Sequence, residues 1–96
     1  MIYRFTSAAL TELKRACLGY DRKEAGLGIR FLAEVDQAVT RIVMAPEAWR
    51  PLSARTRRCL VHRFPFGVLY QIRSREILIV SVMDLRRDPE SWRKHL

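Results

Sequence analysis

Residues 58–83 read RCLVHRFPFGVLYQIRSREILIVSVM, and this stretch decides the fold. It contains three short runs rich in Val, Ile, Leu, Phe and Tyr, the residue types that favour strands. These runs are 58–64, 68–73 and 77–83. The gaps between them, 65–67 and 74–76, have the length of hairpin connections. The stretch therefore predicts three strands in an antiparallel meander.

The last of the three runs is apolar at four consecutive positions, 77–80. A strand with one wet face alternates apolar and polar residues, whereas a strand covered on both faces does not. We therefore expect this strand to lie in the interior of the sheet.

The first half of the chain has a helical period after one short apolar run at 2–5, which reads as a strand. Thr6 or Ser7 can cap a first helix. Its expected buried stripe is Leu10, Leu13, Cys17 and Tyr20. Glycines at 26 and 28 interrupt the pattern. A second stripe follows at Phe31, Val35, Ala38 or Val39, and Ile42. Pro46 cannot continue a helix, so the second helix ends before it.

These elements predict an α+β fold: an N-terminal helical hairpin at about 7–45, packed on one face of an antiparallel sheet of about four strands. The 96 residues are expected to form a single domain, 1–96. The core should include Leu10, Leu13, Phe31, Val35, Ile42, Leu69 or Tyr70, Ile79 and Val82. Asp88 and Pro89 predict a brief C-terminal helical turn that contains Trp92.

The net charge of +8 is distributed unevenly. Residues 1–48 have seven Lys or Arg and six acids, whereas residues 49–96 have eleven Lys or Arg and only four acids. The second half therefore carries nearly the whole excess, which would attract nucleic acid or an acidic protein. The alternative is that this charge serves solubility alone.

The chemistry-bearing residues are few. Cys17 and Cys59 have no second cysteine at metal-site spacing, and only His62 and His95 could add ligands, so no metal and no cofactor is expected. The opening residues MIYRF lack the apolar run of a signal peptide or a membrane span, so a cytoplasmic location and no membrane partner are expected.

Residues 57–72, RRCLVHRFPFGVLYQI, resemble the second and third strands of toxins of the RelE/ParE superfamily. Residues 79–92, IVSVMDLRRDPESW, are similar to the last strand and tail of those toxins, and residues 31–49 to their second helix and its exit. This resemblance covers nearly the whole chain. It implies the toxin of a type II toxin–antitoxin pair, wrapped by a longer cognate antitoxin. The toxin would contact promoter DNA only indirectly, through that antitoxin.

The superfamily is divided by activity. RelE-like members cut messenger RNA on the ribosome without a metal, which requires a base, an acid and cations around the phosphate. They commonly have Arg where this chain has Gly67, His where it has Asp84, and often Tyr near Trp92. These departures favour ParE-like inhibition of DNA gyrase. The metal-independent, ribosome-dependent endoribonuclease is the alternative, so whether the protein is an enzyme stays open. A non-toxic basic nucleic-acid-binding module is a further alternative.

Arginines of the second half are the expected binding residues for the target or the antitoxin. The candidates are Arg57, Arg58, Arg63, Arg86, Arg87 and Trp92. Arg86 and Arg87 follow the interior strand on a loop, where binding residues concentrate, although Arg87 could instead pair with Asp84 or Asp88. Under the nuclease alternative the catalytic candidates are His62, Arg63 and Arg87. The alternation of side chains along the strand would place His62 and Arg58 on one face of the sheet, and Arg63 and Cys59 on the other.

Overall fold

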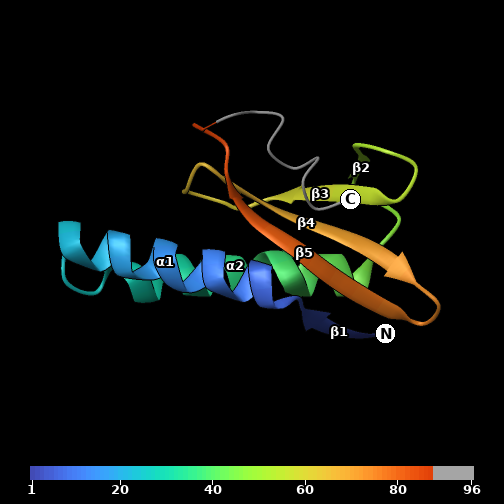
Figure 1. The fold of residues 1–96 in the computed structure, drawn as a ribbon, viewed down its shortest axis with the longest axis horizontal. Coiled ribbons are helices and arrows are strands. Elements are labelled where there is room, and N and C mark those ends of the chain that lie inside the picture. Colours follow the sequence, from blue (N-terminus) through green and yellow to red (C-terminus); the bar gives the residue numbers. More distant parts are fainter. Residues whose placement is uncertain (88–96) are drawn as a thin grey trace.

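The computed structural model describes residues 1–87, and Figure 1 shows two helices side by side along one face of a twisted sheet. The elements are β1 (Ile2–Phe5), α1 (Ser7–Lys23), α2 (Leu27–Met44), β2 (Arg50–Pro51), β3 (Thr56–Leu60), β4 (Phe66–Arg73) and β5 (Glu76–Asp84). The strand order is β1-β5-β4-β3-β2. The predicted α+β fold, with an N-terminal helical hairpin on one face of the sheet, is confirmed. The predicted C-terminal turn and Trp92 lie outside the described residues.

The sheet differs from the prediction in two respects. It has five strands, because the two-residue strand β2 pairs antiparallel with β3 at the edge. It is also mixed, since β1 joins β5 in parallel, with Ile2 opposite Glu76 and Phe5 opposite Ile79. β5 therefore has a neighbour on each side, as its continuous apolar run predicts.

The strand expected at 58–64 begins earlier and ends at Leu60. After Leu60 the chain turns, and the Val61 N–H donates to the Phe66 carbonyl over 2.9 Å. Arg63 has a φ of 69°, in the left-handed region, which an extended strand does not allow. The placement of His62 and Arg63 on a strand is therefore wrong, and both lie in the connection to β4.

The helical hairpin is held by one cap and one close contact. The Thr6 hydroxyl accepts a hydrogen bond from the Ala9 N–H at 3.1 Å, which confirms the predicted cap. At the crossing, Asp21 Oδ1 accepts from the Gly28 N–H at 2.8 Å. A Cβ at position 28 would lie 2.5 Å from the Cys17 carbonyl oxygen, so the two helices approach closely only because residue 28 is glycine.

The second helix buries the predicted stripe of Phe31, Val35, Ala38, Val39 and Ile42. On the first helix, Leu13 and Tyr20 are buried as predicted, but Leu10 is wrong: it is 39% exposed, while Ala9 is fully buried. α1 is rotated so that a small residue faces the sheet, which lets the helix lie close to β5.

Both faces of β5 are covered. On the helix side, Tyr20, Phe31, Phe64 and Phe66 form an aromatic cluster with ring centroids 4.7–6.0 Å apart. On the other face a smaller cluster is buried, formed by Leu69, Leu78, Val80 and Met83.

A β-bulge interrupts the pairing of β4 with β5. Leu69 lies opposite Ser81 and Tyr70 opposite Ile79, so Val80 is the additional residue. Glu12 of α1 reaches this bulge, and its Oε1 accepts from the Ser81 hydroxyl at 2.9 Å and from the Val82 N–H at 3.0 Å. One carboxylate thus satisfies two polar groups in the buried strand and attaches α1 to it.

Candidate binding site at the end of strand β5

Five arginines of the second half lie at two opposite ends of the sheet. Because β4 and β5 are antiparallel, Phe66 faces Asp84 at one end and Arg73 faces Glu76 at the other. The eight residues of β4 separate these ends by about 23 Å at about 3.3 Å per step. Arg63, Arg86 and Arg87 belong to the first end, whereas Arg55 and Arg73 belong to the second.

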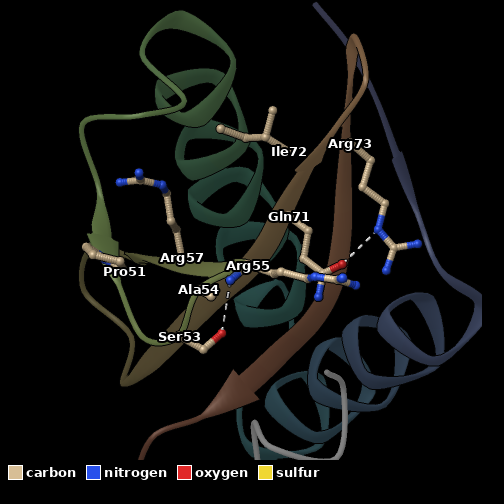
Figure 2. A pocket seen from close by; sticks show the side chains of 8 residues that line it. All are labelled: Pro51, Ser53, Ala54, Arg55, Arg57, Gln71, Ile72 and Arg73. Carbon is tan, nitrogen blue, oxygen red and sulfur yellow. Dashed lines mark hydrogen bonds between the residues drawn. The ribbon is translucent and has the colours of Figure 1, made fainter.

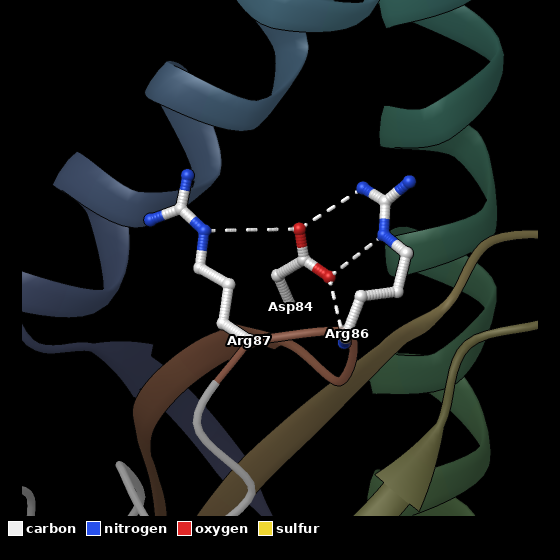
Figure 3. Close-up of polar contacts among 3 residues, drawn as sticks. All are labelled: Asp84, Arg86 and Arg87. Carbon is white, nitrogen blue, oxygen red and sulfur yellow. Dashed lines mark hydrogen bonds and ion pairs between the residues drawn. The ribbon is translucent and has the colours of Figure 1, made fainter.

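At the first end, Asp84 binds both of the arginines that follow it (Figure 3). Asp84 Oδ1 accepts from the backbone N–H and from Nε of Arg86, each at 3.0 Å, and Oδ2 accepts from Arg86 Nη2 at 3.0 Å. Arg87 Nε lies 4.0 Å from the same Oδ2. The bidentate pair with Arg86 is a strong geometry. The Arg86 guanidinium therefore lowers the pKa of the Asp84 carboxyl.

The charges left available at this end belong to Arg63 and Arg87. Their side chains are 84% and 77% exposed, and each has one distant carboxylate partner: Glu34 at 3.8 Å from Arg63, and Asp84 at 4.0 Å from Arg87. Exposed pairs at such distances contribute little energy. Both guanidinium groups can therefore exchange these partners for an external anion, whereas Arg86 would have to give up a bidentate contact.

The nuclease candidates His62, Arg63 and Arg87 lie in the segments that follow β3 and β5. His62 is exposed in the turn after β3, and no hydrogen bond or ion pair within residues 1–87 joins it to Arg63 or Arg87. Asp84, where nuclease relatives often have His, is held ionised by Arg86. This end of the sheet presents cations on a surface.

Arg57 braces the chain after α2. Its Nη1 donates to the carbonyls of Glu47 at 3.0 Å and Trp49 at 2.8 Å. The Tyr70 hydroxyl donates to the neighbouring carbonyl of Pro46, and burial raises the pKa of Tyr70 to about 12. Arg57 therefore has an internal role that the sequence did not indicate.

Arg58 occupies the space above Gly67. A Cβ built at Gly67 would lie 2.9 Å from Arg58 Cδ. The Arg58 side chain on β3 thus covers Gly67 on β4, which has no side chain of its own. Gly67 itself belongs to β4 and not to the turn before it, since it pairs with Leu60.

Sequence reasoning missed the opposite end of the sheet. There, the loop between β2 and β3 and the end of β4 enclose a pocket of about 500 Å³ whose lining includes Arg55, Arg57, Gln71 and Arg73 (Figure 2). The sequence contained a signal for this site in principle, because antiparallel pairing of β3 with β4 brings the start of β3 next to the end of β4. Among residues 1–87, no three His, Cys, Asp or Glu side chains are placed to hold a metal ion. No helix in that range is long and apolar enough to cross a membrane.

Comparisons with known proteins agree with this geometry. The profile of a family described as "ParE toxin of type II toxin-antitoxin system, parDE" matches residues 3–89. A chain of the solved structure "Chromosomal ParDE TA system from P. aeruginosa" superimposes with a TM-score of 0.77 at 18% identity. The alignment covers 88% of this chain and 95% of that one. No curated protein matches the chain.

Proposed function

Because the chain belongs to the family of ParE toxins of type II toxin–antitoxin systems, we propose that it binds and inhibits DNA gyrase in the cytoplasm. Its cognate antitoxin would prevent this binding. In this proposal the toxin is a protein ligand that stalls its target, and it needs neither a metal nor a cofactor.

One observation carries the preference for gyrase over messenger RNA: the bidentate pair of Asp84 with Arg86. RNA cleavage without a metal needs a group that gives a proton to the leaving oxygen. A carboxyl whose pKa is lowered by Arg86 has lost that proton at neutral pH. The same pair occupies Arg86, which then offers little to a phosphate. Both effects argue for a binding surface.

We propose that the antitoxin covers this surface with an acidic, amphipathic segment. Arg63 and Arg87 are exposed cations at this end of the sheet that no close ion pair engages, and Leu60 is an exposed apolar residue at the end of β3. Acidic side chains would steer the partner towards the arginines, and apolar side chains would add contact area.

The test compares two assays of the purified full-length chain. We expect inhibition of DNA supercoiling by gyrase, reversed by the antitoxin, and no cleavage of messenger RNA on ribosomes. In cells, expression without the antitoxin should induce the DNA-damage response and filamentation before translation falls. Ribosome-dependent cleavage with supercoiling unaffected, abolished by Arg63→Ala or Arg87→Ala in a folded protein, would refute the proposal in favour of the endoribonuclease.

A further inference from the structure

The pocket at the far end of the sheet is formed by elements that fix its walls. The loop after β2 turns back because the Ser53 hydroxyl accepts from the backbone N–H groups of Arg55 at 3.3 Å and Thr56 at 3.2 Å. On the opposite side, β4 ends with Gln71, Ile72 and Arg73 (Figure 2). The cavity volume of about 500 Å³ is typical of sites for small molecules.

A buried amide holds one of the pocket's arginines in place. Gln71 is only 2% exposed, and its Nε2 donates to the Thr56 hydroxyl at 3.1 Å. Its Oε1 accepts from Arg73 Nε at 2.9 Å. This contact orients the Arg73 guanidinium and uses one of its five N–H donors, so its terminal nitrogens remain for a ligand.

The pocket is strongly positive. Its described lining contains three arginines, Arg55, Arg57 and Arg73, and no Asp or Glu. The contacts of Arg57 with the Glu47 and Trp49 carbonyls satisfy donors but neutralise no charge. Figure 2 shows the Arg55 side chain extending towards the Gln71 amide, where Arg73 is also bound. Arg55 and Arg73 thus supply the positive charge on the side of the Gln71 amide, whereas the Arg57 side chain points away from it (Figure 2).

We propose that this pocket binds the phosphate groups of a small phosphorylated molecule of nucleotide size. A carboxylate presents one charge and two oxygens, which a single arginine satisfies, whereas a terminal phosphate presents about two charges and three oxygens and suits several arginines. The volume exceeds what an isolated phosphate needs, so it leaves room for the remainder of the ligand.

This pocket is separate from the surface assigned to gyrase and the antitoxin, because β4 lies between the two ends. Absence of ligand binding in this pocket would therefore leave the proposed inhibition of gyrase unaffected. Absence of gyrase inhibition would likewise leave the proposed ligand site unaffected. Arg50 and Arg75 offer a matched control: both are exposed arginines that are absent from the pocket lining.

The experiment is calorimetric titration of the full-length chain with ADP, and then with pyrophosphate, adenosine, tri-glutamate and a short DNA duplex. We expect ADP and pyrophosphate to bind, and adenosine and tri-glutamate to bind at least about tenfold more weakly. The variant R55Q/R73Q should lose about tenfold or more in ADP affinity, because charge-assisted hydrogen bonds are lost. The control R50Q/R75Q should change it by less than about threefold, since exposed charges act weakly at a distance.

Three results would overturn the proposal. Equal losses in the two double variants would mean that net charge alone attracts ADP. If adenosine or tri-glutamate bound as tightly as ADP, the pocket would not recognise phosphate specifically. Binding of duplex DNA, dependent on Arg55 and Arg73 and without binding of ADP, would assign the pocket to the backbone of a nucleic acid. Circular dichroism of each variant keeps these outcomes separate from misfolding.

Discussion

At the scale of single residues, Gly28 decides how closely the helices pack. We expect Gly28→Ala to destabilise the protein by about 1–3 kcal/mol, because its Cβ would meet the Cys17 carbonyl and the Asp21 side chain. The matched control is Gly19→Ala in α1, where no atom lies within 4 Å of the added Cβ. That variant should gain about 0.5–1 kcal/mol from helix propensity. Urea unfolding of both proteins measures the difference, and equal effects would contradict the close contact.

Tyr70 predicts a dependence on alkaline pH. Its pKa is raised to about 12 by burial, whereas an unfolded tyrosine has a pKa of about 10. Above pH 10 the unfolded chain loses this proton first, so the folded state becomes less stable as pH rises towards 12, by at most about 1.4 kcal/mol per pH unit. Below pH 10 the group has no such effect.

The variant Tyr70→Phe isolates this contribution. At neutral pH it should be less stable by about 1–2 kcal/mol, since the Pro46 carbonyl loses its donor. The stability difference between the two proteins should then shrink as the pH rises from 10 towards 12 in urea titrations. A constant difference over that range would show that Tyr70 titrates normally.

Residue types alone did not separate structural from binding arginines. Arg57 and Arg58 are adjacent and identical in the sequence, yet Arg57 donates to two carbonyls and Arg58 covers Gly67. Both roles depend on segments that pairing brings together, which no local pattern records. Leu10 was misplaced for a similar reason: the 3.6-residue period fits a stripe through either residue 9 or 10, and packing on β5 selected Ala9.

At the scale of elements, Glu12 connects α1 with the bulge in β5. We expect Glu12→Ala to cost about 2–4 kcal/mol, because the buried Ser81 hydroxyl and Val82 N–H lose their shared acceptor. Glu12→Gln keeps one acceptor oxygen and should lose less. Hydrogen exchange at the Val82 amide provides a local readout: it should accelerate in the alanine variant, and unchanged protection would argue against the contact.

Local pattern predicted the helices and four of the five strands, and missed what depends on distant partners. The helix stop before Pro46 and the cap at Thr6 are encoded within a few residues, so both were predictable. The parallel pairing of β1 with β5 and the two-residue strand β2 exist only through their neighbours. Residues 61–64, which lie in a turn, were predicted as strand because Val61 and Phe64 have strand propensity, although Arg63 adopts a left-handed conformation.

At the scale of the whole molecule, antitoxin binding should depend on the cations at the β5 end of the sheet. Arg63→Glu with Arg87→Glu should weaken the antitoxin complex by about tenfold and flatten its salt dependence, because both charges are exposed at the β5 end. The control Arg15→Glu with Arg22→Glu, on exposed positions of α1, makes the same charge change elsewhere.

Binding titrations at several salt concentrations test this prediction, and equal losses in both double variants would mean that only net charge matters. Arg57 and Arg86 are unsuitable for charge reversal, although the sequence pointed to them. Reversing Arg57 would break its hydrogen bonds to the Glu47 and Trp49 carbonyls, and reversing Arg86 would place a second carboxylate beside Asp84.

The carboxylate of Glu12 also bears on when the protein can complete its fold during its own synthesis. Ser81 and Val82 follow Glu12 by 69 and 70 residues. The pairing of β1 with β5 joins segments that are similarly far apart in the sequence. Contacts of such sequence separation form late and slowly. Until β5 has left the ribosome, α1 therefore lacks the strand on which it packs, and β1 and β4 lack their shared neighbour in the sheet.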